Sequence, residues 1–389
     1  MFLPSSAIIA TCEPYLGGAG KIATQVLREF ARRDYPVDLV CLELPHLFEN
    51  VPGPQPRIIR PEGVIANAIP EMDLFIPFRL AEAMIRAATA RARAGLDVTL
   101  WGTYLIPYAA ASHLAAASLR ARGVRVRLVV SPAGSDIWQI GPQLYHATEQ
   151  LLFADAVDAR LTYTQSFAQE IQTMFVREAP FHTIYPILDL ERFCPPLPRE
   201  RETAREALDI PHNSFVICCH CNMRPVKRPT MVVALAREVA ARDPGGHYTL
   251  LMVGPADGEI RSAASGNWNN LTIVWTGASG RVECVLRAAD VAANWSSHDS
   301  FNGSLMEAMG LGLPLVSTNV VGIGTEIAAA GAGALFAENE IAAAAEYILR
   351  LARDRELREK TAQSAAAHAA RTFGAAALFE DYARVLLAE

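Results

Sequence analysis

An alternation of short apolar segments with longer amphipathic ones runs along the chain, stops at a proline-rich stretch, and then starts again. The apolar segment 6–14 is followed by a glycine-rich turn, a helical pattern over 21–33 and a second apolar segment at 36–44. Strand, glycine turn, helix and strand in this order are typical of a doubly wound α/β domain with a parallel sheet.

The alternation breaks where three prolines fall between Cys194 and Arg199, and the charged run after them suits a linker. It resumes with the apolar segment 214–223. A chain of 389 residues fits two domains better than one. The segment 341–373 is predicted to be helical throughout. We predict two α/β, Rossmann-like domains and a C-terminal helix that packs back on the first of them, with boundaries at 1–190, 191–370 and 371–389.

The composition narrows the function classes. A net charge of −6 argues against a nucleic-acid binder, which needs a basic surface. No apolar run reaches the roughly 18–20 residues of a membrane helix, and the N-terminus reads as a first strand. Seven irregularly spaced cysteines favour a reduced, cytoplasmic protein. Cys218 to Cys221 read as strand residues that alternate between faces, so we expect core packing there and no metal.

The segment 296–319 places two acids around the start of a predicted helix. Asp299 stands in a polar turn at the end of a strand, and Glu307 lies about one turn inside the helix. A helix start binds phosphate through free N–H groups and its dipole. A carboxylate at each acid position could bind sugar hydroxyls. The alternative is a capped helix with a surface acid. The residues predicted to contact a ligand here are Asp299, Phe301, Asn302, Gly303, Ser304 and Glu307.

A basic turn follows the strand 214–223. Arg224 and Lys227 are separated by Pro225 and Val226, and two cations at the end of a strand suit the oxygens of a diphosphate. A solvated basic loop is the alternative. We expect Thr276 and Gly277, after another strand of the same half, to lie beside the base of a nucleotide.

The first half carries three weaker features at strand ends. They are the glycines Gly17 and Gly18, the polar pair Ser135 and Asp136, and the aromatic pair Tyr104 and Tyr108. The glycines allow close approach of a ligand, the polar pair could bind one, and the tyrosines could line a pocket. A tight turn, helix capping and core packing are the respective alternatives.

Several motifs are missing from the sequence. It contains no P-loop, no GxSxG nucleophile elbow and no Asp-x-Asp that would hold a divalent ion beside a diphosphate. We therefore predict that the protein uses no metal and no cofactor, and that a nucleotide enters only as part of a substrate.

Taken together, these segments resemble a known family over nearly the whole chain. Residues 299–327 resemble the acid-x7-acid signature of retaining GT-B glycosyltransferases of family four. The segments 15–31, 101–115, 133–141, 222–229 and 373–386 fall in the order expected for that family. Residues 222–228 and 103–111 are most similar to its bacillithiol-pathway branch, which transfers N-acetylglucosamine from a UDP donor to L-malate.

The resemblance implies a GT-B fold and a role for each site residue. Glu307 would bind the donor ribose, and Asp299 the hydroxyls of the transferred sugar. Arg224 and Lys227 would neutralise the diphosphate, with Gly303 and Ser304 donating from the helix start. Gly17 and Gly18 would meet the same diphosphate, and Asp136 would lie on the acceptor side, as would Tyr104, Tyr108 and Ser135.

Three positions depart from the family pattern. Asp299 replaces the usual Glu and is shorter by one methylene, Ala133 replaces a usual His, and Asn222 stands where many relatives have an arginine. We expect a retaining, metal-independent transfer of a sugar from UDP or GDP to a small hydroxy acid, thiol or natural-product intermediate. A catalytically impaired nucleotide-sugar-binding subunit and a GT-B isomerase are the alternatives, and a homodimer is left open.

Overall fold

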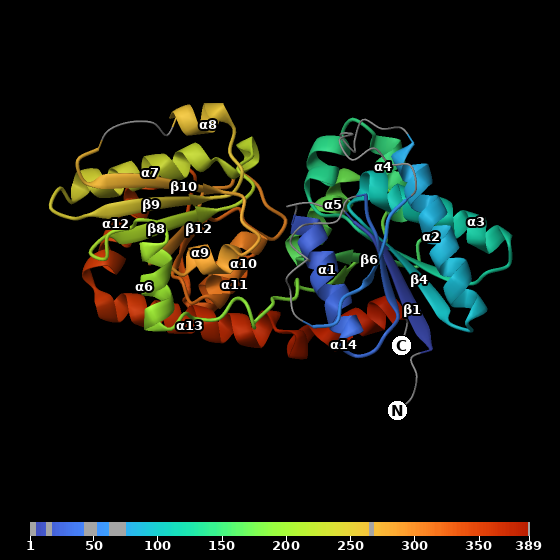
Figure 1. The fold of residues 1–389 in the computed structure, drawn as a ribbon. Coiled ribbons are helices and arrows are strands. Elements are labelled where there is room, and N and C mark those ends of the chain that lie inside the picture. Colours follow the sequence, from blue (N-terminus) through green and yellow to red (C-terminus); the bar gives the residue numbers. More distant parts are fainter. Residues whose placement is uncertain (1–4, 13–17, 43–52, 62–74, 264–267, 388–389) are drawn as a thin grey trace. The chain divides into compact units, whose positions relative to one another are not determined.

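The computed structural model describes residues 5–12, 18–42, 53–61, 75–263 and 268–387, and it divides the chain into two compact units. Unit 1 comprises Met1–Ile187 and Ala375–Glu389, and unit 2 comprises Leu188–Gly374. Each unit holds one parallel sheet with helices packed against it (Figure 1). Within the described ranges, no helix is both long and apolar enough to span a bilayer.

In unit 1 the described strands pair in the order β3-β2-β1-β4-β5-β6-β7. These strands are β1 Ser6–Thr11, β2 Val37–Val40, β3 Arg57–Ile59, β4 Asp97–Thr103, β5 Val126–Ser131, β6 Ala159–Thr162 and β7 His182–Thr183. Its helical elements are α1 Gly18–Ala31, α2 Ile76–Arg93, η3 Leu105–Ala109, α3 Ala110–Ala121, η4 Asp136–Ile140, α4 Tyr145–Phe153, α5 Gln165–Met174 and α14 Ala375–Leu387.

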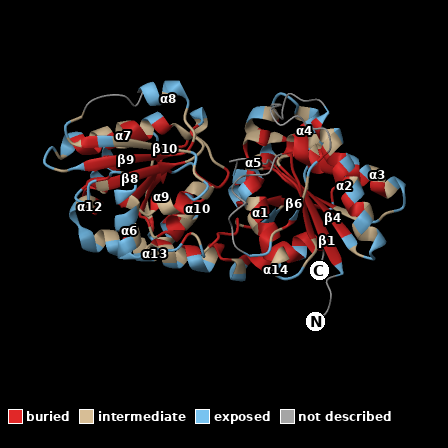
Figure 2. Ribbon diagram, viewed as in Figure 1, coloured by how far each residue is buried: buried red, intermediate tan, exposed pale blue. Residues whose placement is uncertain are grey.

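Alternate strand residues of unit 1 face two separate cores, because side chains on a strand point to opposite faces in turn. Ile9 packs on the side of α2, α3 and α5, whereas Ile8 packs on the side of α1 and α14. The inner strands β1, β2, β4 and β6 are almost wholly buried, as Figure 2 shows in red for β1, β4 and β6, whereas the outer strands β3 and β7 are partly exposed. Continuous apolar strands are what a parallel sheet covered on both faces requires.

The C-terminal helix α14 belongs to unit 1, as predicted. The hydroxyl of its fully buried Tyr382 donates to the carbonyl of Tyr185, 3.1 Å away. The guanidinium of Arg127, on β5, donates to the carbonyl of Val385 at 3.0 Å. The helix therefore covers one face of the unit 1 sheet.

In unit 2 the described strands pair in the order β10-β9-β8-β11-β12-β13. They are β8 Phe215–His220, β9 Tyr248–Val253, β10 Leu271–Gly277, β11 Val291–Asn294, β12 Leu315–Thr318 and β13 Gly333–Phe336. The helical elements are α6 Pro198–Glu206, η5 Pro225–Lys227, α7 Pro229–Arg242, α8 Gly258–Ala263, α9 Val282–Leu286, α10 Gly303–Gly310, α11 Gly324–Ala330, α12 Ile341–Arg353 and α13 Arg355–Phe373.

Two predicted elements of unit 2 are wrong. The charged run assigned to a linker forms helix α6, whose first turn begins at Pro198. The single helix expected over 341–373 is broken at Asp354, whose side chain caps α13 by accepting from the N–H of Leu357 at 2.9 Å. An Asp at a helix start satisfies an N–H group that has no partner inside the helix, so it favours a new helix over a continuous one.

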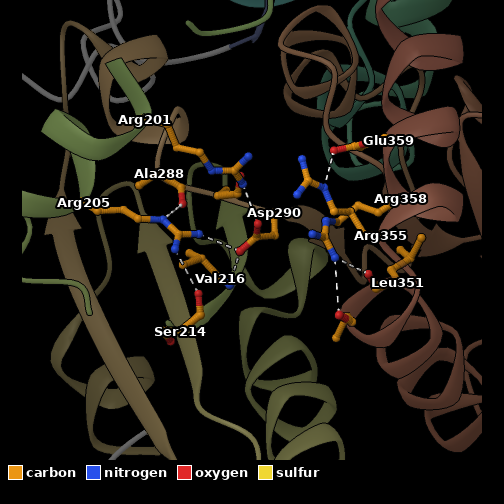
Figure 3. A network of polar contacts seen from close by, with 12 residues as sticks. Arg201, Arg205, Ser214, Val216, Ala288, Asp290, Leu351, Arg355, Arg358 and Glu359 are labelled. Atoms are coloured by element: carbon orange, nitrogen blue, oxygen red, sulfur yellow. Dashed lines mark hydrogen bonds and ion pairs between the residues drawn. The ribbon is translucent and has the colours of Figure 1, made fainter. Parts of the chain in front are cut away.

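Helix α6 is held to the sheet of unit 2 by a buried ionic network (Figure 3). Asp290, just before β11, accepts from Arg205 at 2.7 Å, from Arg201 at 2.5 Å and from the backbone N–H of Val216 at 2.7 Å. Arg205 also donates to the carbonyls of Ala288 and Ser214, and its side chain is only 8% exposed. Each charge of the network is thus paired and hydrogen-bonded, which a buried ion requires.

Candidate active site

The candidate site of unit 2 lies where the strand order of its sheet reverses. Chain order runs outward from β8 to β9 and β10 on one side, and from β11 to β12 and β13 on the other. Strands β8 and β11 are direct neighbours, so the loops after them leave the sheet side by side. Ligands of doubly wound sheets bind beyond the carboxyl ends of strands at such a reversal. The predicted basic turn follows β8, and the predicted acidic turn follows β11.

The two loops are hydrogen-bonded to each other. The backbone N–H of Ser297 donates to the carbonyl of Val226 at 2.9 Å, and the Ser297 hydroxyl donates to the same carbonyl at 3.2 Å. Arg224 is exposed just before the short helix η5, which ends at Lys227. Arg228 ion-pairs with Glu338 at 2.6 Å. The link through Val226 fixes the basic turn beside the acidic one.

Lys227 and Asp299 form an ion pair at the centre of these loops. The Lys227 Nζ lies 2.5 Å from Oδ2 of Asp299, and the two side chains are 16% and 10% exposed. The backbone of Asp299 is held as well, because its carbonyl accepts from the N–H of Gly322 at 3.0 Å. A Cβ at Gly322 would lie 2.1 Å from the carbonyl oxygen of Ser300, so only glycine permits this approach.

Helix α10 begins directly after the acidic turn. Asn302 adopts a left-handed conformation with φ of 79°, and its side-chain oxygen accepts from the N–H of Leu305 at 3.1 Å. Gly303 and Ser304 are half-buried at the first turn, and a Cβ at Gly303 would meet open space. The first N–H groups of a helix have no partner within it, so this end of α10 can bind an anion.

Two of the residues predicted to contact a ligand point elsewhere. The ring of Phe301 is 2% exposed and packs edge-on against Phe373, 5.8 Å between centroids. Asn302 is 4% exposed and uses its carbonyl oxygen to cap α10. Phe301 therefore anchors the turn in the core, and Asn302 starts the helix.

Glu307 lies on the same helix with its carboxylate against a histidine. Oε2 of Glu307 is 3.0 Å from Nε2 of His220, the last residue of β8. The sequence pattern does not indicate a role for this histidine, which lies 87 positions from Glu307.

Thr276 and Gly277 end β10, which is separated from β8 by β9. Gly277 has φ of 70° and its carbonyl accepts from the N–H of Gly254 at 2.9 Å. Both residues are half-buried, and they lie at the carboxyl ends of the parallel strands, as do the loops after β8 and β11.

The cysteines of β8 follow the alternation predicted for them. Cys219 and Cys221 face the core that contains α7 and α12. A hydrogen bond with the Cys219 thiol lowers the pKa of Cys221, and the Lys227 ammonium acts in the same direction. Among the described residues, no group of three His, Cys, Asp or Glu side chains could hold a metal ion.

The predicted residues of unit 1 also follow strand ends. The hydroxyls of Tyr104 and Ser135 are 2.9 Å apart, and the rings of Tyr104 and Tyr108 are 6.5 Å apart. Tyr104 has φ of 69°, an uncommon conformation for a non-glycine residue. Gly18 is exposed at the start of α1, and Gly17 lies outside the described residues.

Asp136 is fully buried and its carboxylate is occupied by the backbone. It accepts from the N–H groups of Leu105, Ala133 and Gly134 at 2.7–3.1 Å. Burial raises the pKa of Asp136, and these hydrogen bonds oppose the rise. Asp136 therefore ties the loop after β5 to the loop after β4, and it sets the places of Ser135 and Tyr104.

Two family models match successive parts of the chain. The model of glycosyltransferase family 4 matches residues 16–192, and that of glycosyl transferases group 1 matches residues 200–368. They meet near the division between the two units.

The chain is a GT-B glycosyltransferase.

Two curated relatives of this glycosyltransferase, which carry different names, match different shares of the chain. It is 26% identical to N-acetyl-alpha-D-glucosaminyl L-malate synthase of Bacillus anthracis over 362 residues, which are 91% of this chain and 90% of the relative. It is 29% identical to D-inositol 3-phosphate glycosyltransferase of Corynebacterium efficiens over 197 residues, 48% of this chain and 46% of that one.

Solved structures share the fold of the glycosyltransferase. Sucrose-phosphate synthase of Thermosynechococcus elongatus matches with a TM-score of 0.76 at 17% identity, covering 99% of this chain and 100% of that one. The HepE protein of Anabaena, solved in complex with UDP-glucose, matches with a TM-score of 0.76 at 17% identity, covering 98% and 100%. At these identities the likeness concerns the fold.

Proposed function

We propose that the protein transfers a sugar, with retention and without a metal ion, from a UDP- or GDP-sugar to a small-molecule acceptor. The observation that carries this proposal is the grouping of Lys227, Asp299, Glu307 and the start of α10 at one reversal of the unit 2 sheet. Cations, an anion-binding helix end and carboxylates are what a diphosphate between two hydroxylated rings needs.

Each group has one role in the proposal. Arg224 and Lys227 neutralise the diphosphate, and the first N–H groups of α10, at Gly303 and Ser304, donate to it. Glu307 accepts from the ribose hydroxyls, and Asp299 from the hydroxyls of the transferred sugar. Because Lys227 now pairs with Asp299, a bound diphosphate would share the ammonium with that carboxylate.

The proposed reaction is a transfer on one face of the sugar. The acceptor oxygen or sulfur bonds to the anomeric carbon on the face from which the diphosphate leaves, and the bond from that carbon to the diphosphate oxygen breaks. The acceptor's proton passes to the departing phosphate. Negative charge grows on the diphosphate during this step, so fixed cations and helix N–H groups lower the barrier.

The comparisons support the donor class. One relative carries N-acetylglucosaminyl in its name, and one structural neighbour was solved with UDP-glucose. The acceptor is proposed to meet the side of unit 1 that carries Tyr104, Tyr108 and Ser135, with Asp136 holding their loops. All seven cysteines are free thiols, which agrees with a proposed cytoplasmic location.

A donor panel tests the proposal. The purified protein is incubated with UDP- and GDP-sugars, and slow release of the nucleoside diphosphate by water or by an added hydroxy acid or thiol is measured. Retention is checked by NMR of the anomeric proton of the product. Tight nucleotide binding without turnover would favour the impaired subunit, and interconversion of the sugar without transfer would favour an isomerase.

Chelation is expected to leave the rate unchanged. Lys227 and Arg224 supply the charge that a divalent ion would otherwise bring to the diphosphate, so millimolar EDTA should change the initial rate by less than about twofold. The initial rate measured with added Mg²⁺ in place of EDTA is the matched control. A rate that collapses with EDTA and returns with Mg²⁺ would contradict metal independence while leaving the transfer itself in place.

A further inference from the structure

His220 lies behind the carboxylate that is proposed to bind the ribose. Its Nε2 is 3.0 Å from Oε2 of Glu307, and the two side chains are 6% and 12% exposed. This contact joins the end of β8 to the first turns of α10. It is therefore part of the strand reversal that forms the site, although neither the sequence pattern nor the proposed mechanism uses it.

The strand pairing determines which way His220 points. The backbone N–H of Cys221 donates to the carbonyl of Val253 at 3.0 Å, so the pairing of β8 with β9 continues past His220. Cys219 and Cys221 pack in the core beneath α7, and the residue between them must face the other side. That side carries α10, and the imidazole meets Glu307 there.

A carboxylate that receives two neighbouring hydroxyls must present its oxygens in one plane. The last torsion of a Glu side chain is broad, so an unsupported carboxylate rotates and loses freedom when a ligand binds. A hydrogen bond from an imidazole N–H to one oxygen fixes that plane and leaves acceptor capacity on both oxygens. A mostly buried carboxylate also needs such a donor to offset its lost hydration.

We propose that His220 is a positioning residue, which holds the Glu307 carboxylate in the orientation that accepts the 2′- and 3′-hydroxyls of the donor ribose. This inference rests on the proposed function, because it takes Glu307 as the ribose ligand. It adds a residue from a different element to the recognition of the nucleotide. His220 is not proposed to contact the reacting atoms, so its effect is on the affinity of the protein for the donor nucleotide.

The test compares ribonucleotides with their deoxy analogues by calorimetry. UDP and GDP are titrated first, and the nucleotide that binds is then compared with its 2′-deoxy and 3′-deoxy forms. The wild type should bind the deoxy forms about tenfold or more weakly, the expected effect of losing a hydrogen bond to a charged group. His220→Leu should weaken the ribonucleotide about five- to tenfold and the deoxy forms by less than about twofold, so that the ratio falls.

Two further variants separate positioning from packing. His220→Gln keeps an N–H donor near the same place and should restore most of the ribonucleotide preference. His368→Leu is the matched control, because His368 Nε2 also lies 2.6 Å from a carboxylate, that of Glu326, with side chains 15% and 17% exposed. This control should lose a comparable contact and keep the wild-type ratio.

The outcomes are distinct. An unchanged ratio in folded His220→Leu, or a ratio that falls equally in His368→Leu, overturns the role of His220 and leaves the proposed function intact. If His220→Leu does not fold, His220→Ala replaces it, and an unchanged ratio in folded His220→Ala overturns the role. If the wild type binds neither UDP nor GDP, the proposed nucleotide donor fails first, and this inference fails with it.

Discussion

Replacement of Lys227 by Ala is expected to lower kcat of sugar transfer by about 10²–10³-fold, the usual effect of removing one group that stabilises charge in the transition state. The Lys227 ammonium lies 2.5 Å from Asp299, between the loops after β8 and β11. It is the cation whose charge the departing diphosphate would meet. Release of nucleoside diphosphate under saturating donor measures the loss.

The neighbouring arginine provides the matched control for this experiment. Arg228→Ala removes a cation one position along the chain, but its guanidinium is paired with Glu338. We expect this variant to keep kcat within about threefold of the wild type, because long-range effects of half-exposed charges are screened. Turnover that persists in a folded Lys227→Ala protein, or an equal loss in Arg228→Ala, would refute the diphosphate role of Lys227.

Replacement of Asp290 by Ala is expected to destabilise unit 2 by about 3–5 kcal/mol, since it leaves the buried guanidinium of Arg205 without its carboxylate. For a unit of this size, such a loss lowers Tm by roughly 10 °C. Differential scanning calorimetry of the full chain measures the change, and far-UV circular dichroism at low temperature shows whether the variant still folds.

An exposed ion pair in the same region provides the comparison. Arg355 and Glu359 lie 2.7 Å apart on α13, with side chains 81% and 54% exposed (Figure 3). Glu359→Ala should leave Tm unchanged, because solvent replaces the lost contact. Equal Tm values for Asp290→Ala and the wild type would show that the buried network is replaced by water or by repacking.

Several features of the fold could be predicted because each depends on local pattern. The apolar segments form strands, and the turns predicted at 224–228 and 299–303 follow the ends of β8 and β11 in the structure. The charged run that forms α6 was predicted to be a linker, because charged side chains are usually exposed to solvent. Arg205 is charged and buried, and its partner Asp290 is 85 positions away.

The site was predictable at the level of loops and not of side-chain pairs. Glu307 and Asp299 could be identified from their spacing around a helix start. Sequence spacing does not show that His220 supports one of them or that Lys227 pairs with the other, because these contacts depend on the adjacency of β8 and β11. The inward turn of Phe301 likewise follows from the position of Phe373, on α13.

The return of α14 to unit 1 has a consequence for biosynthesis. Unit 2 is one continuous stretch, so all of it has been translated before the last helix of unit 1 exists. Until Tyr382 and Leu386 emerge, the sheet surface around Ile8 and Leu39 lacks the helix that covers it. The half that the ribosome makes first can therefore complete its core only after the last helix has emerged, and one apolar face of its sheet stays uncovered until then.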